Sequence, residues 1–265
     1  MYDDKKSRCA VSPNRYVGIT GFMCREEVDY ALSVLPNGLK LMCGVLVSQK
    51  SFVGERNKWR RRYPAIQEIK NIFSDDPRCL NLIHYSTSKP MDAFLIAELF
   101  QLGGRHLHGF QFNGVWPEPH LLSFNNAHVV LQVRPPASER WDVVMAFENT
   151  LKGQIHAVLK QIGDCHVHVL IDASGGRGLP IEPTTCQRWA HIITKHFPGQ
   201  VHIGFAGGLA ADSLPRVDKL VQVWDASIDA EGRLRDGDEG GTLNFDKVRE
   251  YLAAAGRVML AQKNT

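Results

Sequence analysis

The sequence lacks a strong excess of charge of either sign. Its 31 lysine and arginine residues nearly balance 28 aspartate and glutamate residues, which leaves a formal net charge of +3. A protein that binds nucleic acid generally carries a marked basic excess concentrated on one face. The composition therefore argues against nucleic acid as a partner, although charge alone identifies no partner.

Long hydrophobic runs are also missing. No segment approaches the roughly 18 consecutive apolar residues that a membrane-spanning helix needs. The first residues, Met1 to Lys6, lead into no apolar stretch of the kind found in a secretory signal. We therefore expect a cytoplasmic enzyme or binding protein with no membrane partner.

The cysteines are few and far apart in the chain. None belongs to a C-x-x-C pair, and none has a histidine at zinc-site spacing. In the pairs His106/His108 and His166/His168 the two-residue spacing on a strand puts both rings on one face, where we expect no carboxylate or cysteine to complete a metal site. We predict reduced thiols, no metal and no cofactor. The six cysteines are Cys9, Cys24, Cys43, Cys79, Cys165 and Cys186.

Strand-like and helix-like patterns alternate from end to end of the 265 residues, which is typical of repeated βα units around a parallel sheet. Eight such pairs predict a closed (β/α)8 barrel, an α/β fold, as a single domain over residues 1–265 with one irregular basic loop at 49–64. A doubly wound open sheet is the alternative, but it would normally carry a phosphate loop after the first strand, and Gly18 to Gly21 lacks the G-x-G-x-x-G spacing. The expected strands are Tyr16–Phe22, Lys40–Ser48, Cys79–Ser86, Gly109–Val115, Val129–Arg134, Val167–Ala173, His202–Ala206 and Val221–Ala226. The expected helices are Glu26–Val34, Ala65–Phe73, Met91–Leu102, a short piece near Pro117–Phe124, Glu139–Gln161, Thr185–His196, Ser213–Leu220 and Phe245–Leu260.

Three of the later strands end in small or polar residues. Phe205 to Leu209 contains Gly207-Gly208, Val223 to Ser227 ends in Asp-Ala-Ser, and Val169 to Gly178 ends in Asp172 followed by glycines. Paired glycines let backbone N–H groups approach phosphate oxygens closely, and barrels commonly bind phosphate after strands seven and eight. One Gly-Gly pair alone is more often a plain turn, but three such ends in order favour a site.

These strand ends resemble those of phosphoribosylanthranilate isomerases over most of the chain and in the same order. Residues 16–20 are similar to that family's Lys-x-Cys-Gly-Ile-Thr, and 111–114 to its Gln-Leu-His-Gly. Asp172 with 175–178 resembles its Asp followed by Gly-Gly-Thr-Gly, and 207–208 its phosphate glycine pair. Residues 225–227, with 232–236 beyond, resemble its Asp-x-Ser-Ser-Gly and Gly-x-Lys-Asp. The resemblance implies a barrel enzyme that isomerises a phosphorylated sugar, with Gly207, Gly208 and Ser227 holding the phosphate.

The chain departs from the family pattern at three places. Val17 stands where the family has its general-base cysteine, and an isopropyl group cannot accept a proton. Ile228-Asp229 replaces Ser-Gly, so a carboxylate would repel phosphate unless Asp229 points away. Ser48-Gln49-Lys50 stands roughly where the family has Ser-Pro-Arg. The resemblance thus implies Asp172 as the acid of an acid–base pair whose base is replaced, and not an efficient phosphoribosylanthranilate isomerase.

Polar residues at strand ends would converge on one mouth of a barrel. We expect Asp172 to be catalytic, with a helix cap or salt bridge as its alternative role, and His84 to be a general base or else a structural histidine. Arg134 would pair with a substrate anion or bridge to an acid, and Lys50 offers a cation rather than a Schiff base. The remaining expected substrate contacts are Asn113 and Arg177.

The basic segment from Glu55 to Tyr63 combines five cations with two aromatic residues. It could contact nucleic acid, close over the mouth as a lid for an anionic ligand, or be a solvated loop. Together these observations predict an acid–base isomerase or lyase of a phosphorylated sugar or similar small anion. The alternative is a non-catalytic barrel that binds a phosphorylated ligand or a protein. The sequence predicts no oligomeric state.

Overall fold

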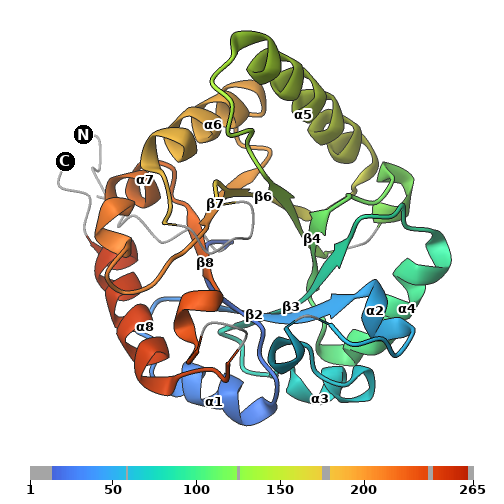
Figure 1. The fold of residues 1–265 in the computed structure, drawn as a ribbon, viewed down its shortest axis with the longest axis vertical. Helices are drawn as coiled ribbons and strands as arrows, with labels where there is room; N and C mark the ends of the chain where they lie inside the picture. Colours follow the sequence, from blue (N-terminus) through green and yellow to red (C-terminus); the bar gives the residue numbers. More distant parts are fainter. Residues whose placement is uncertain (1–13, 58, 124–125, 175–179, 238–240, 262–265) are drawn as a thin grey trace, which may run out of the picture.

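The computed structural model describes residues 14–57, 59–123, 126–174, 180–237 and 241–261. Eight parallel strands pair in sequence order and close into a barrel, with β1 joined to β8 (Figure 1). The predicted barrel is thereby confirmed, and the open-sheet alternative is wrong. The strands are β1 Val17–Thr20, β2 Leu41–Ser48, β3 Cys79–Thr87, β4 Gly109–Gly114, β5 His128–Val133, β6 His166–Asp172, β7 His202–Ala206 and β8 Ser227–Ala230.

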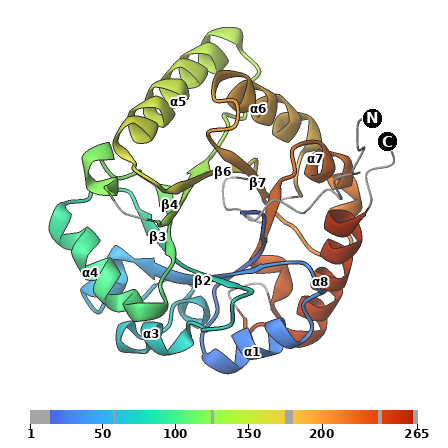
Figure 2. The same ribbon diagram turned by 180° about the vertical axis from the view of Figure 1, so that it is seen from behind.

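Helices form a ring around the strands, as both views of the ribbon show (Figures 1 and 2). Between β4 and β5 the described chain has only a 3-10 turn where most βα units have a helix. No helix among the described residues is both long enough and apolar enough to span a bilayer. The α-helices are α1 Arg25–Ser33, α2 Gln49–Phe52, α3 Ile69–Ile72, α4 Ala93–Gly103, α5 Trp141–Gln161, α6 Pro183–His196, α7 Asp218–Val223 and α8 Phe245–Leu260. The 3-10 helices are η1 Arg60–Arg62, η2 Ile66–Glu68, η3 Gly104–His106, η4 Pro119–Leu122, η5 Leu214–Arg216 and η6 Gly232–Leu234.

The expected eighth strand, Val221–Ala226, is wrong. Val221 to Val223 is the last turn of α7, and Val221 N donates to Val217 O in helical fashion. Asp225 then adopts a left-handed backbone with φ +47, which ends the helix, and the strand begins only at Ser227. Apolar residues on the buried side of a short helix imitate a buried strand because both give a short apolar run.

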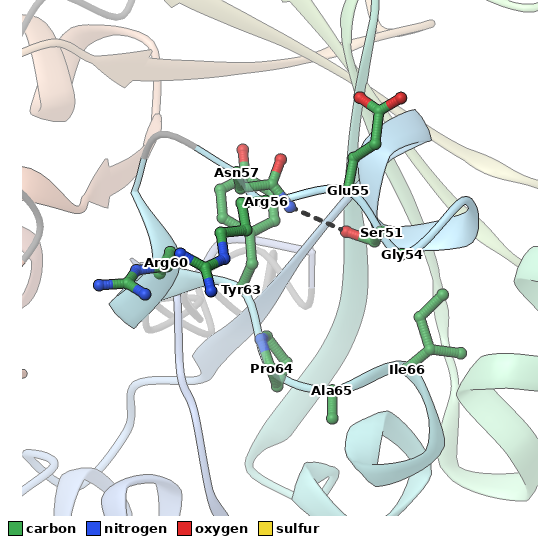
Figure 3. Close-up of a pocket in the computed structure, with 10 residues that line it drawn as sticks. All are labelled: Ser51, Gly54, Glu55, Arg56, Asn57, Arg60, Tyr63, Pro64, Ala65 and Ile66. Atoms are coloured by element: carbon green, nitrogen blue, oxygen red, sulfur yellow. Dashed lines mark hydrogen bonds between the residues drawn. The ribbon is translucent and has the colours of Figure 1, made fainter.

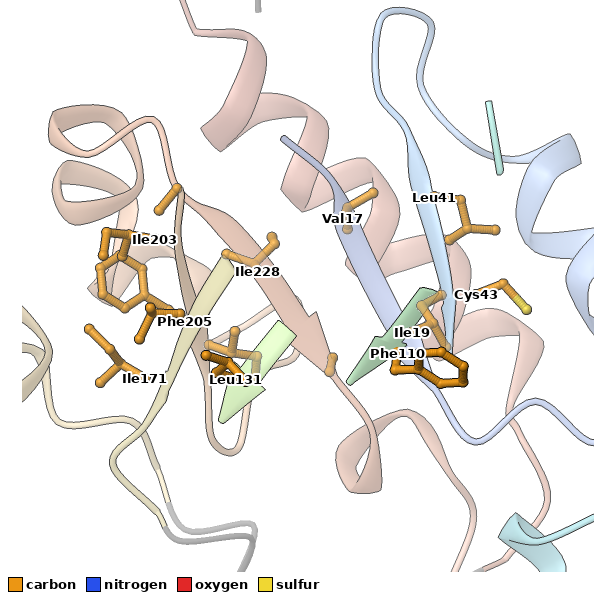
Figure 4. Close-up of a cluster of buried hydrophobic side chains, with 14 of the residues drawn as sticks. Val17, Ile19, Leu41, Cys43, Phe110, Leu131, Ile171, Ile203, Phe205 and Ile228 are labelled. Carbon is orange, nitrogen blue, oxygen red and sulfur yellow. The ribbon is translucent and has the colours of Figure 1, made fainter. Parts of the chain in front are cut away.

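Successive strand residues point to opposite sides of the barrel wall, as the pleat requires. Val17 and Ile19 of β1, and Leu41 and Cys43 of β2, pack outward into the large core under the helices (Figure 4). The strand residues that alternate with these outward-facing ones form a separate apolar cluster, which includes Met42, Leu82, Val130 and Leu170. This second cluster fills the middle of the barrel, so the interior is a packed core rather than a pore.

The barrel interior is polar at both ends of that apolar middle layer. At the N-terminal ends of the strands lie four histidines, His128, His166, His168 and His202, with ring centroids 4.7–5.3 Å apart between neighbours. At the C-terminal ends lies a second polar layer that contains two aspartates. In a (β/α)8 barrel the C-terminal end is where the chemistry takes place.

Candidate functional site

The polar layer at the C-terminal end brings together side chains from six strands. Each is buried, with no more than 8% of its surface exposed, and each belongs to the inward-facing parity of its strand. The layer joins residues that lie up to 209 positions apart in the chain. Its members are Thr20 of β1, His84 of β3, Gln111 and Asn113 of β4, Gln132 of β5, Asp172 of β6 and Asp229 of β8.

Asp172 ends β6, and among the described residues it is held by hydrogen bonds rather than by a cation. Its Oδ1 accepts from the Ser174 backbone N at 3.0 Å and from Ser174 Oγ at 2.7 Å, and its Oδ2 accepts from Gln132 Nε2 at 2.8 Å. The helix that follows is capped instead by Glu182, which accepts from Thr184 N and Thr185 N. Neither structural alternative considered for Asp172 matches these contacts. The carboxylate is fixed at the top of the barrel with its partners on one side.

His84 lies at the centre of the layer as a neutral ring. Asn113 Nδ2 and Gln111 Nε2 both contact His84 Nε2, and His84 Nδ1 lies 3.4 Å from Thr20 Oγ1. Burial lowers the pKa of His84 to about 4, and the positive charge of Arg134 adds to that effect. The structure thus brings together the predicted residues His84 and Asn113. A histidine with this pKa is a weak base at neutral pH.

Asp229 is the member of this layer to which the sequence analysis gave no catalytic part. Thr20 Oγ1 donates to its Oδ1 at 2.9 Å, with Oδ2 at 3.1 Å. Burial raises the pKa of Asp229 to about 7, and Glu231 and Asp172 push it the same way, against hydrogen bonds from Thr20 and Gln111. A carboxyl group with that pKa exchanges its proton near neutral pH. The sequence signal that could have identified Asp229 as inward-facing is the alternation of polar Ser227 and Asp229 with apolar neighbours. That pattern is visible only once β8 is placed at 227–230.

The glycine pair follows β7 and lies beside Asp172. Gly207 has φ +112 and Gly208 φ +56, and a Cβ on Gly207 would lie 3.0 Å from Asp172 Oδ1 and 3.2 Å from Ser174 Oγ. Arg233 of η6 reaches over the pair, since its Nη1 donates to Gly208 O at 3.2 Å and its Nη2 to Asp212 at 2.9 Å. The sequence analysis missed Arg233. It lies in the 232–236 segment that had been noted only for its glycine and aspartate.

Ser227 does not lie with this glycine pair. It is the first residue of β8, at the N-terminal end of the barrel, and its Oγ accepts from Tyr16 N at 3.1 Å. Asp225, just before it, pairs with Arg15 at 2.7 Å. The expectation that Ser227 joins the phosphate site at the mouth is wrong in position, because the strand was placed about five residues too early.

Val17 faces away from the barrel interior. It is fully buried in the outward core, whereas Gly18 and Thr20 are the residues of β1 that face inward. Met42 and Asp229 fill the space that a side chain at Gly18 would need. The inward polar group that β1 supplies is therefore the hydroxyl of Thr20.

Three predicted substrate contacts lie at the edge of the site or outside the description. Arg134 is exposed, and its Nε donates to Gln132 Oε1 at 3.2 Å, so it bridges to Asp172 through Gln132. Lys50 is exposed on α2. Arg177 lies outside the described residues.

The basic loop after β2 forms a cavity of about 220 Å³ that is separate from the polar layer (Figure 3). Its lining includes Ser51, Asn57 and two exposed arginines, Arg56 and Arg60. The loop is tied to the rim after β8, because Arg62 pairs with Glu231 at 2.7 Å and Arg235 Nη1 donates to Arg61 O at 3.3 Å. The segment expected to be irregular therefore contains α2 and η1 and is fixed to the barrel.

Within the described residues, no group of three or more histidine, cysteine, aspartate or glutamate side chains is arranged to hold a metal ion. The four histidines at the N-terminal end of the barrel form no such group either. Their ring nitrogens contact other side chains instead: His128 Nδ1 lies 3.1 Å from His168 Nε2, and His202 Nε2 lies 3.0 Å from Asn14 Nδ2.

No family model matches the chain, and no curated protein matches it. Among solved structures it is similar to a phosphoribosyl anthranilate isomerase in complex with reduced 1-(o-carboxyphenylamino)-1-deoxyribulose 5-phosphate. The TM-score is 0.59 at 13% identity, over 91% of this chain and 98% of that one. It is similar also to phosphoribosyl anthranilate isomerase from Thermotoga maritima, with a TM-score of 0.58 at 14% identity over the same shares. The chain shares its fold with these isomerases. At this identity the likeness concerns the fold and not the reaction.

Proposed function

We propose that this protein is an acid–base enzyme, an isomerase or lyase, that acts on a phosphorylated sugar or a similar small anion. The observation that carries the proposal is the pair of buried aspartates, Asp172 and Asp229, in one polar layer at the C-terminal end of the barrel. They have different partners: Ser174 and Gln132 for the first, Thr20 and Gln111 for the second. Two carboxyl groups in unlike surroundings can divide the roles of acid and base.

The phosphate would lie at Gly207 and Gly208, with Arg233 beside it. Both glycines have a positive φ at the end of β7, and backbone of this kind can form an anion-binding nest of N–H groups. Arg233 already reaches the carbonyl of Gly208 and could exchange its exposed partner Asp212 for a phosphate oxygen. The isomerase of the same fold binds a phosphorylated ligand, which supports this class of substrate.

Gln111 supports a ligand rich in hydroxyl groups. Its Oε1 is buried and has no hydrogen-bond partner among the described residues, although its Nε2 lies 3.1 Å from His84 Nε2. A buried acceptor without a partner costs about 1–3 kcal/mol, and a sugar hydroxyl that donates to it would recover that energy.

Thermal denaturation against inorganic phosphate, a panel of sugar phosphates and the reduced carboxyphenylamino-deoxyribulose phosphate would test binding. A ligand at 100 times its dissociation constant should add about 2.7 kcal/mol of stability. Arg233→Ala should lower the affinity for every phosphorylated ligand, whereas Arg249→Ala, an exposed arginine of α8 paired with Asp246, should leave it unchanged. No stabilisation by any member of the panel would refute the phosphate site.

Turnover would be tested on the sugar phosphates that bind, including phosphoribosylanthranilate. Asp172→Asn should reduce kcat by about 100-fold or more, because the amide has nearly the same size as the carboxylate but cannot exchange a proton. Asp246→Asn on α8 provides the matched control. An unchanged kcat in Asp172→Asn would remove Asp172 from the mechanism.

A non-catalytic barrel that binds a phosphorylated ligand is the second candidate. The low exposure of the polar layer favours it, since Asp172 is only 3% exposed and Asp229 only 6%. Under this reading a sugar phosphate stabilises the protein, and neither the wild type nor any variant turns it over.

A further inference from the structure

We propose that Asp229 is the catalytic base of this site and that Thr20 is its positioning residue. The inference rests on the proposed function and identifies its proton acceptor. It replaces His84, which we had expected from the sequence to be the base.

Thr20 contacts Asp229 directly. Thr20 Oγ1 donates its only proton to the carboxylate of Asp229, at 2.9 and 3.1 Å from the two oxygens. The same hydroxyl oxygen lies 3.4 Å from His84 Nδ1, and Asn113 Nδ2 contacts His84 Nε2. A chain of hydrogen-bond contacts therefore runs from Asn113 through His84 and Thr20 to Asp229. It ends on the carboxylate, which is the one member with no proton to give and the capacity to accept one.

Asp229 faces groups from several of the elements around it. None of these described groups is a cation, so no ion pair within the described part of the chain neutralises the carboxylate. Burial raises the pKa of Asp229 to about 7, which suits a base that must be ionised and yet proton-avid near neutral pH. Burial raises the pKa values of two neighbouring tyrosines, and the charge of Asp229 adds to that effect. The facing groups are Thr20 of β1, Gln111 of β4, Asp172 of β6, Glu231 after β8, Tyr16 before β1 and Tyr251 of α8.

Strand β1 leaves room for the Asp229 carboxylate. Gly18 pairs with Asp229 in the β1–β8 register, and a Cβ at Gly18 would lie 2.8 Å from Asp229 Oδ1. Any larger residue would displace the carboxylate from Thr20. The glycine and the threonine of β1 thus both serve the placement of one acid of β8.

With Asp229 and Asp172, the protons taken from and given to the substrate in an isomerisation are balanced. The ionised Asp229 takes a proton from a substrate carbon, the C–H bond breaks, and the electron pair stays on the substrate as a new C=C bond. The substrate oxygen or nitrogen that receives the displaced electrons takes up a proton delivered through Asp172, which takes one from solvent in the same step. The substrate has then lost one proton and gained one, and exchange with water returns each aspartate to its starting state.

The experiment compares Asp229→Asn with the wild type on the sugar phosphates that the wild type turns over. We expect kcat to fall at least about 100-fold, while the dissociation constant of the reduced carboxyphenylamino-deoxyribulose phosphate changes less than about threefold. Asp246→Asn again serves as the control. A kcat in Asp229→Asn close to that of the active wild type would overturn the inference and leave the proposed function standing. Loss of ligand binding in Asp229→Asn would also overturn it, because Asp229 would then be a binding group.

Failure of the proposed function has a different signature. A wild type that binds the reduced analogue and turns over no member of the panel would overturn the enzymatic reading and the base assignment together. A wild type that binds no phosphorylated probe would refute the phosphate site as well.

Thr20 is tested through the pH profile. Thr20→Val removes the hydrogen bond that favours the ionised carboxylate, so the acidic limb of the kcat profile should move to higher pH. Thr20→Ser keeps the hydroxyl and should restore the wild-type limb. A profile that Thr20→Val leaves in place would overturn the positioning role, even if kcat falls through lost packing.

Discussion

The burial of Asp229 has a cost to stability that depends on pH, and Asp229→Asn should remove it. The folded protein holds the Asp229 proton up to a pKa of about 7, whereas the unfolded chain releases it near 3.8. Between these values the folded state binds more protons than the unfolded state, so the free energy of unfolding falls as pH rises. A pKa raised from 3.8 to about 7 corresponds to roughly 4 kcal/mol, which the wild type has lost in full above pH 7.

The asparagine variant does not titrate and keeps an oxygen that can accept from Thr20. Relative to the wild type it should therefore gain stability between pH 4 and pH 8, by an amount approaching that figure. At about 2–4 °C per kcal/mol, the difference in Tm between the two proteins should change by on the order of 10 °C. Any constant effect of the substitution on packing cancels in this comparison, as does the titration of every other group.

Differential scanning calorimetry of both proteins at pH 4.5, 6 and 8 provides the measurement. The same series with Asp246→Asn, an exposed residue of α8 paired with Arg249, shows how much any Asp→Asn change contributes. A difference in Tm that stays constant across the series, or that moves against the variant as pH rises, would refute the assignment of a raised pKa to Asp229. The result does not depend on any substrate.

Further predictions concern the barrel ends and the backbone. Burial lowers the pKa of His128 to about 3 and that of His168 well below its ordinary value. The protein should therefore lose stability as pH falls from about 6.5 towards 3. Each of these histidines should contribute up to roughly 1.4 kcal/mol of lost stability for each pH unit. In calorimetric scans, His168→Leu should reduce this loss. Gly109→Ala would place a Cβ 1.9 Å from His128 O and should cost about 3 kcal/mol or more in urea unfolding, or prevent folding. Gly153→Ala, on α5 with no atom within 4 Å of its Cβ, should instead stabilise the protein by about 0.5–1 kcal/mol. Equal effects of the two alanines would contradict the clash at Gly109, and an acid transition that His168→Leu leaves unchanged would contradict the role of the histidines.

Most of the fold could be predicted because buried parallel strands and their covering helices have different periods. The seven strands from β1 to β7 were found within a few residues, and α8 was placed at the residues where it occurs. The eighth strand was missed for a physical reason. Ser227–Ala230 is short and carries an aspartate, whereas the neighbouring run Val221 to Trp224 is more apolar and belongs to a helix whose buried side is Leu220 and Val221. Composition alone favoured the wrong segment.

The site was harder to predict because it depends on which side of the wall each residue faces. Asp172 was identified from its position at a strand end, and the structure places it in the inward polar layer with Gln132. Asp229 was assigned to a phosphate loop because the misplaced strand put it beyond the barrel. Arg233 had no sequence signal, since its position over Gly208 depends on the path of the chain after β8. An error of a few residues in one strand thus changed the expected roles of Ser227 and Asp229.

The position of Val17 shows why a motif match can mislead about chemistry in a barrel. The comparison with Lys-x-Cys-Gly-Ile-Thr directs attention to Val17 as a lost base, but Val17 packs under the helices, and a thiol at that position would face Ile19 and the outer core rather than the ligand. The inward positions of β1 are Gly18, which leaves space for the Asp229 carboxylate, and Thr20, which donates to it. A proton acceptor for this barrel must therefore come from a neighbouring strand, and β8 supplies one within hydrogen-bond distance of β1. On this reasoning Val17→Cys should create no new activity, whereas a substitution as small as Gly18→Ala should impair turnover by displacing Asp229.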